Sequence, residues 1–266
     1  MTSRVPESAL ERTVGHTPRR VLVTGAARGL GAALTAAYRA RGDEVLATDV
    51  AEGGDLRLDI TSDGDWAAAV DHVERTWAGL DVLVNNAGVA GGGRLDRSTL
   101  DEWRRVTEIN LFGAVRGTRA FVPMLKAQRS GQIVNVASLA GLVHPAGMAS
   151  YNAVKAAVVA LTETTAHELA PYGVRAAVVC PSYFRTGLLD DLQGEDRELG
   201  AVIAHLVATA PLGPDDIAAE VLAALDRGEE LILPDPAARA AYDLKLRDRA
   251  EYDAQQRHQA ERLAAL

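Results

Sequence analysis

Cysteine is almost absent from this chain, which has a single one, Cys180, among 266 residues. One cysteine excludes a disulfide within the chain and a metal site built from several cysteines. This composition fits a reducing compartment, and we expect a cytoplasmic protein without a bound metal.

Aromatic residues and positive charge are also scarce. Phe, Trp and Tyr make up 5% of the chain, and its formal net charge is −8. An acidic chain is poorly suited to binding a phosphate backbone, and few aromatics argue against stacking on single-stranded bases. No apolar run reaches the ~20 residues that a membrane-crossing helix needs. The sequence therefore predicts neither a nucleic-acid partner nor a membrane partner.

Apolar residues, at 48%, are abundant enough for a full core, and the length suits one large α/β domain. From Arg20 onward, short apolar runs alternate with stretches of helical periodicity. The expected strands cover 21–23, 44–49, 56–60, 80–84, 132–137, 174–180 and 230–233. This alternation predicts a doubly wound parallel sheet, a Rossmann fold of about seven strands with helices on both faces.

The same pattern suggests how the chain is divided. Residues 1–19 lack the apolar stretch of a signal peptide and are expected to be a mobile leader. Residues 20–235 are predicted to form a single domain, in which about 183–213 is a loop or lid near the substrate. The remainder, 236–266, is rich in Ala and charged residues and predicts a helical tail.

The predicted tail helix has a weak apolar stripe at Tyr242, Leu246 and Ala250. Such a stripe is compatible with a solvated helix of mixed charge or with a contact to another subunit. Two longer helices are expected at about 98–128 and 151–172.

A glycine-rich segment, Thr24–Gly31, follows the first expected strand and begins a helix. Glycines there permit a tight turn, and the N–H groups at the start of the helix can bind a pyrophosphate. The candidate cofactor-binding residues of this segment are Gly25, Arg28, Gly29, Leu30 and Gly31. Glycines alone are weak support, since many loops contain them, but the strand before and the helix after favour a dinucleotide site.

Asp49 ends the second expected strand, 18 positions after Gly31. A carboxylate at that place can accept hydrogen bonds from both ribose hydroxyls of an adenosine, and it repels a 2′-phosphate. Asp49 therefore favours NAD over NADP, although Arg28 could help to hold a 2′-phosphate. A solvated carboxylate at a strand end is the alternative.

Tyr151 and Lys155 are four residues apart, which places them on one face of a helix. An ammonium about 4 Å from a phenol, at an effective dielectric near ~20, favours the ionised form by about 4 kcal/mol. That equals about three pKa units, which would lower the pKa of Tyr151 from ~10 towards neutrality although burial opposes it. Ser138 ends the fifth strand, where ligands bind in such sheets, and its hydroxyl can hold a substrate oxygen.

Taken together, the motifs resemble the short-chain dehydrogenase/reductase family, in its single-domain branch of about 250 residues. The residues that carry the resemblance are Thr24-Gly-x-x-x-Gly-x-Gly31, Asn85-Asn86-Ala87-Gly88, Asn110, Ser138 and Tyr151-x-x-x-Lys155. Their order and spacing agree with the family pattern over roughly 20–233.

The resemblance implies a role for each matching residue. Tyr151 would exchange a proton with the carbinol or carbonyl oxygen, Lys155 would lower its pKa and hold the nicotinamide ribose, and Ser138 would orient the substrate. Asn110 would hold a water that links Lys155 to solvent.

Further cofactor contacts are implied for Asp59, Ile60, Asn86, Ala87, Gly88, Pro181 and Thr186. Asp59 has a second interpretation, as a helix-capping or turn aspartate. Ser182 replaces the glycine that follows Pro181 in the family, so the resemblance does not predict the conformation of this turn.

The substrate side is less diagnostic. Its candidate contacts are Ser138, His144, Met148, Phe184 and Leu188, most of them apolar. We therefore expect an NAD-dependent enzyme that interconverts a hydrophobic secondary alcohol and its ketone. An NADP-dependent ketoreductase of the 3-oxoacyl type and a non-catalytic dinucleotide sensor are the alternatives. Family members pair their two long helices, which implies a homotetramer or homodimer.

Overall fold

A central parallel sheet organises the molecule, in the computed structural model that describes residues 17–187 and 196–265. Within these residues seven strands are hydrogen-bonded in the order β3-β2-β1-β4-β5-β6-β7. They are β1 (Arg20–Thr24), β2 (Glu44–Asp49), β3 (Leu56–Arg57), β4 (Val82–Asn85), β5 (Gly131–Val136), β6 (Val174–Val179) and β7 (Leu231–Ile232). The doubly wound Rossmann fold is thus confirmed, and the chain order reverses between β1 and β4, where such sheets bind ligands.

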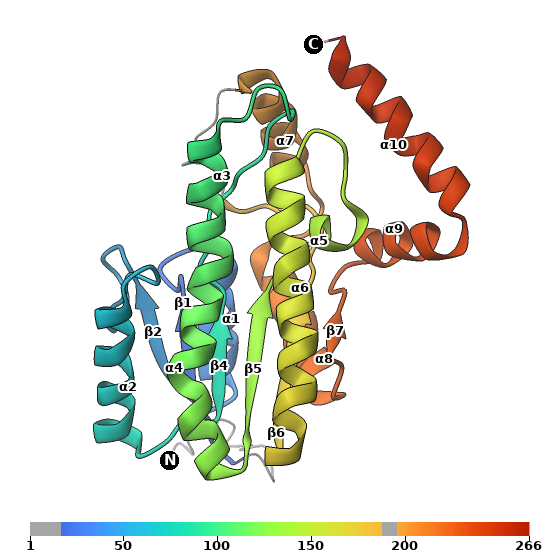
Figure 1. The fold of residues 1–266 in the computed structure, drawn as a ribbon. Coiled ribbons are helices and arrows are strands. Elements are labelled where there is room, and N and C mark those ends of the chain that lie inside the picture. Colours follow the sequence, from blue (N-terminus) through green and yellow to red (C-terminus); the bar gives the residue numbers. More distant parts are fainter. Residues whose placement is uncertain (1–16, 188–195, 266) are drawn as a thin grey trace, which may run out of the picture.

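Helices cover both faces of this sheet (Figure 1). They are α1 (Gly29–Ala40), α2 (Asp63–Trp77), α3 (Leu100–Thr107), α4 (Gly113–Gln128), α5 (Ala140–Val143), α6 (Ala149–Leu169), α7 (Arg197–Ala208), α8 (Pro214–Asp226), α9 (Pro236–Arg247) and α10 (Arg249–Ala264). A π-helical turn, η1 (Glu108–Phe112), joins α3 to α4, and a 3₁₀ turn, η2 (Ala170–Tyr172), follows α6.

Alternating strand residues enter two separate cores, as the two-residue period of a strand requires. One core joins strand residues such as Val23 to α1 and α8. The other joins neighbours such as Leu22 to α2, α4 and the end of α6. Because both faces are buried, most residues of the central strands are apolar, which is why the strands were recognisable in the sequence; Gln132 and Asn135 of β5 are buried exceptions.

Three expected elements differ from the structure. The third strand was expected to reach Ile60 but ends at Arg57, and the long helix expected at 98–128 is interrupted by η1. Part of the expected loop 183–213 is helical, since α7 lies within it, whereas 188–195 lie outside the described residues. The leader expected at 1–19 also lies almost wholly outside them.

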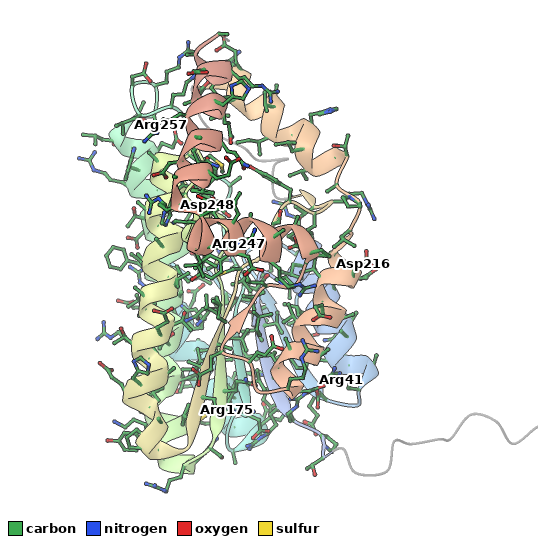
Figure 2. All side chains as sticks on the ribbon, turned by 90° about the vertical axis from the view of Figure 1, so that its right-hand side faces the viewer. Arg41, Arg175, Asp216, Arg247, Asp248 and Arg257 are labelled. Carbon is green, nitrogen blue, oxygen red and sulfur yellow. The ribbon has the colours of Figure 1, made fainter. Side chains whose placement is uncertain are left out.

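The tail consists of two helices with a corner at Asp248 (Figure 2). The carboxylate of Asp248 accepts a hydrogen bond from the Glu251 N–H at 3.0 Å and so begins α10. Of the expected apolar stripe, Tyr242 packs against a core cluster, whereas Leu246 is 67% exposed and Ala250 is exposed; the buried apolar residues of α10 are Tyr252 and Leu263. No helix among the described residues is long and apolar enough to span a membrane.

Candidate active site

A cavity of about 1140 Å³ lies at the carboxyl ends of the parallel strands. Its lining includes residues that directly follow five of them, namely Gly25, Val50, Leu58, Asn86 and Ala137. Since parallel strands end at one edge of the sheet, residues far apart in the sequence meet there.

The glycine loop between β1 and α1 forms one wall of the cavity. Gly29 has φ +57°, and a Cβ on it would lie 3.0 Å from the Thr186 hydroxyl. A Cβ on Gly31 would lie 2.0 Å from the Gly25 carbonyl oxygen, so no larger residue fits without moving the backbone. The loop therefore exposes backbone to the cavity at the N-terminus of α1, as an approaching pyrophosphate requires.

Asn86 fixes this loop to the end of β4. Its side-chain amide donates to the Thr24 carbonyl at 2.8 Å and to the Gly25 carbonyl at 3.2 Å. In return the Thr24 hydroxyl accepts hydrogen bonds from the Asn86 and Ala87 N–H groups, both at 3.0 Å. The predicted residues Asn86, Ala87 and Gly88 thus stabilise the loop as well as line the cavity.

Asp49 lies at the end of β2 and lines the same cavity. Its two carboxylate oxygens accept the N–H groups of Ala27 and Ala51, each at 3.0 Å. These contacts hold the negative charge beside the glycine loop and leave lone pairs for two ribose hydroxyls. Arg28, the N-cap residue of α1, also lines the cavity.

Asp59 and Ile60 line the cavity near Asp49 and Val50. The Asp59 carboxylate accepts the N–H of Thr61 at 2.9 Å and its hydroxyl at 2.7 Å. The interpretation of Asp59 as a turn residue is therefore confirmed, and its place in the cavity is compatible with an adenine contact as well.

Tyr151, Lys155 and Ser138 all line the cavity. Tyr151 and Lys155 share a face of α6, with the Lys155 nitrogen 5.7 Å from the centre of the Tyr151 ring. That nitrogen donates a hydrogen bond to the Val136 carbonyl at 3.0 Å. Ser138 follows β5, and its hydroxyl is hydrogen-bonded to the Tyr151 phenol. The sequence prediction that these three side chains share one site agrees with this geometry.

The electrostatics of the pair differ from the expectation. Burial raises the pKa of Tyr151 to about 12, and the hydrogen bond from Ser138 only partly opposes it. Burial also lowers the pKa of Lys155 to about 8. The expected fall in the tyrosine pKa is therefore wrong, because desolvation is the largest influence on the pKa of this buried phenol.

Asn110 lies behind the cavity in the π-helical turn η1. Its side-chain oxygen accepts the Val89 N–H at 2.8 Å, and its amide donates to the Val89 carbonyl at 3.0 Å. Asn110 is 4% exposed and does not line the cavity. A π-helical turn widens the helix by one residue and often occurs at functional sites. Here the turn separates α3 from α4 at the position of Asn110.

The loop after β6 closes the other side of the cavity, and both Pro181 and Thr186 line it. The Ser182 N–H donates to the Asp235 carboxylate at 2.9 Å. Non-glycine residues with positive φ among the described residues are Ala78, Arg129 and His144. Ser182 therefore replaces the family glycine without left-handed strain.

The predicted substrate contacts have different outcomes. Met148 and Phe184 line the cavity beside Ser138. His144 does not line it, which corrects the expectation: its ring contacts the Gly141 carbonyl at 3.1 Å and the Lys245 ammonium of α9 at 2.9 Å. Leu188 lies outside the described residues.

Two further elements line the cavity. The apolar side of α7 contributes Val202, Ile203, Leu206 and Val207. The tail helix α10 contributes Gln255, His258, Gln259, Arg262 and Leu263, none of which the sequence had suggested. The available signal was Asp248 followed three residues later by Glu251, a capping pattern that predicts a separate helix.

Comparison with known proteins identifies the family. The sequence model described as short chain dehydrogenase matches residues 19–197. The chain belongs to this family. A 3-alpha-(or 20-beta)-hydroxysteroid dehydrogenase of Mycobacterium bovis is 38% identical over 182 residues, which cover 64% of this chain and 70% of the relative.

Solved structures of short-chain dehydrogenases show the same fold. One from Burkholderia phymatum in complex with NAD has a TM-score of 0.80 at 30% identity and covers 87% of this chain and 94% of its own. Another from Burkholderia cenocepacia in complex with NADP has a TM-score of 0.76 at 30% identity and covers 90% and 97%. The protein is therefore an oxidoreductase that interconverts a secondary alcohol and a ketone of a small molecule with NAD(P).

Proposed function

We propose that this short-chain dehydrogenase prefers NAD(H) and acts on an apolar secondary alcohol or its ketone, with Tyr151 as the acid/base. The observation that carries the proposal is a single cavity that extends from Asp49, past the glycine loop, to Ser138 and Tyr151. A dinucleotide bound along it would have its adenosine at Asp49 and its nicotinamide at Tyr151.

The residues present fit such a cofactor. The glycine loop has no room for a Cβ at Gly31, and the N-terminus of α1 would face the pyrophosphate of the cofactor. When bound, NAD(P) supplies the acceptor or donor of the hydride.

The preference for NAD rests on Asp49. Its carboxylate is held in place by two backbone N–H groups, so it cannot swing away from a 2′-phosphate without losing both. Arg28 lines the same region and is the feature that would favour NADP. A fixed negative charge is the stronger effect, because like charges in a partly enclosed site repel at close range.

Ser138 and Tyr151 would act together on the substrate oxygen. In ketone reduction the Ser138 hydroxyl donates a hydrogen bond to the carbonyl oxygen, and the Tyr151 phenol transfers its proton to that oxygen as the carbinol forms. The raised pKa of Tyr151, about 12, keeps the phenol protonated at neutral pH and suits it to this direction.

Lys155 and Asn110 would return a proton to the Tyr151 phenol after the ketone has been reduced. With a pKa lowered to about 8, Lys155 can release and regain a proton near neutral pH more readily than an exposed lysine. Asn110 is fixed by Val89 and keeps one amide N–H and one oxygen lone pair for a water. This relay is the role that a non-catalytic sensor would not need.

We further propose a cytoplasmic homotetramer or homodimer built on α4 and α6. Leu100 of α3 and Phe112 of η1, the turn that leads into α4, are 71% and 46% exposed and line one surface pocket. Apolar residues of this size on one face favour a protein contact.

The test is a nicotinamide absorbance assay of the purified protein over ketones of graded size, with NADH and with NADPH. We expect turnover with NADH at higher kcat/KM. Asp49→Asn keeps the oxygen that accepts the Ala27 N–H but removes the charge, so the NADPH/NADH ratio of kcat/KM should rise at least about tenfold.

Asp243→Asn is the matched control, because Asp243 is exposed on α9 and does not line the cavity. It should leave the ratio unchanged. An unchanged ratio in Asp49→Asn would refute the cofactor preference, and absence of turnover with every ketone would refute the proposed activity.

A further inference from the structure

One face of the tail helix α10 forms part of the cavity wall. Gln255, His258, Gln259 and Arg262 all line the cavity, and their spacing of three and four residues places them on one side of the helix. In Figure 2, α10 passes in front of the upper end of the fold, above the corner at Asp248. These polar side chains thus face the substrate end of the cavity.

The first half of α10 is held against the segment that follows Ser138. The Tyr252 phenol donates a hydrogen bond to the Val143 carbonyl, and the Gln256 side-chain oxygen accepts the Ala146 N–H at 3.3 Å. Tyr252 is 5% exposed and packs with Val143. α10 is therefore attached to the cavity rather than projecting freely into solvent.

The last turn of α10 is attached as well. The Arg94 guanidinium donates to the Leu263 carbonyl at 2.7 Å, and it also pairs with the buried carboxylate of Asp196 at 2.7 Å. The Leu263 side chain packs in the same apolar cluster as Met148 and Tyr151. Arg262, which precedes Leu263, is exposed and lines the cavity close to this cluster.

The wall formed by α7 is apolar. Val202 and Leu206 line the cavity although they are 38% and 41% exposed, and the buried Ile203 lies between them. Met148 and Phe184 add to this apolar surface. A ligand between α7 and α10 would therefore meet apolar groups on one side and polar groups on the other.

Among the residues of α10 that line the cavity, Arg262 carries a positive charge and none carries a negative charge. Arg262 makes no side-chain hydrogen bond or ion pair with any part of the chain that the structure describes, whereas Gln255 donates to Glu251 at 2.9 Å. The carboxylates among the described lining residues are Asp49 and Asp59, both at the proposed adenosine end. Among the described lining residues, the substrate end thus holds a guanidinium and no carboxylate.

We propose that the substrate is a keto acid or the corresponding hydroxy acid, with a carboxylate at the end opposite the reacting carbon that binds Arg262. The proposal rests on the proposed function, since Tyr151 must act on the other end of the same molecule. A guanidinium presents two parallel N–H groups that match a carboxylate, and the Gln259 amide, one turn earlier, is placed to donate to it as well. The apolar body of the substrate lies against α7.

The test compares keto acids of graded length, cyclic and linear, with their methyl esters, in the full chain with NADH. We expect the best keto acid to have a kcat/KM at least about tenfold above that of its ester, because the ester removes the charge and keeps the shape. Arg262→Gln should lose this preference and keep the turnover of the ester.

Arg257→Gln is the matched control, since Arg257 is an exposed arginine of α10 that does not line the cavity (Figure 2). Arg262 is five positions further along, which places the two side chains on different sides of the helix. It should keep the preference for the acid. Retained turnover of the ester shows that each variant is folded.

The outcomes separate the two proposals. The carboxylate site is refuted, and the ketone reductase stands, if the wild-type protein reduces acid and ester equally well or reduces only simple ketones. The same holds if Arg262→Gln loses acid and ester reduction to the same extent. If no ketone, acid or ester is reduced, the proposed function fails and the carboxylate site fails with it.

Discussion

Replacement of Lys155 by methionine should make the protein more stable while it removes a residue of the proposed proton relay. Lys155 is 5% exposed, and burial lowers the pKa of its ammonium to about 8 from 10.5. Folding therefore has to desolvate this charge, and a methionine side chain at the same position would fill the space without one.

The pKa shift sets the size of the effect. A change from 10.5 to about 8, at ~1.36 kcal/mol per pKa unit, destabilises the folded wild-type protein by about 3 kcal/mol at neutral pH. The variant loses the hydrogen bond to the Val136 carbonyl, which costs about 1–2 kcal/mol. We expect Lys155→Met to be more stable by about 1–2 kcal/mol at pH 7.

The pH dependence gives a sharper test. Because the folded pKa is below the unfolded one, the unfolded wild-type protein binds more protons between pH 8 and 10.5, and wild-type stability rises with pH in that interval. The advantage of Lys155→Met should therefore shrink and reverse by about pH 10. Ionisation of Tyr151 is common to both proteins and cancels in the difference.

The assay is urea unfolding of both proteins without cofactor, followed by tryptophan fluorescence at several pH values. A difference in unfolding free energy that stays constant from about pH 7 to pH 10 would refute the reasoning. It would mean that water reaches Lys155 and that its burial does not perturb its titration.

Two further predictions concern the cavity. Gly31→Ala should reduce NADH affinity at least about a hundredfold, since its Cβ would lie 2.0 Å from the Gly25 carbonyl oxygen. Gly64→Ala on α2 is the control, because its Cβ would make only an ordinary contact. Equal NADH affinity of the two variants in a titration would contradict the binding of the cofactor at the glycine loop. The rate of alcohol oxidation should rise by up to about tenfold per pH unit from about pH 7 to 10, because Tyr151 must accept a proton and its pKa is raised to about 12. The rate of ketone reduction should change little over that range. An oxidation rate that is independent of pH would speak against Tyr151 as the base.

The sequence predicted most of the sheet and the centre of the site for one physical reason. In a parallel sheet the strands are apolar throughout, and the residues after them gather at one edge, so Asp49, Asn86 and Ser138 could be placed together from their strand-end positions alone. The spacing of Tyr151 and Lys155 then defined a helix face directed at the same edge.

What the sequence could not predict depends on packing between distant segments. The contacts of Tyr252 with Val143 and of Arg94 with Leu263 bring α10 over the cavity, and no local pattern encodes them. His144 was expected at the substrate but is engaged by Lys245 of α9. Nor does spacing reveal how deeply a pair is buried, which is why the pKa of Tyr151 rises where a fall was expected.

The most direct test of the central claim is Tyr151→Phe. NADH binding and ketone reduction should be measured on the same preparation, with Tyr183→Phe as the control, because Tyr183 also lines the cavity but donates only to the Met148 sulfur at 3.7 Å. We predict that Tyr151→Phe binds NADH with unchanged affinity and loses at least about a thousandfold in kcat, while Tyr183→Phe keeps most of its activity. Full turnover by Tyr151→Phe would contradict the assignment of Tyr151 as the acid/base.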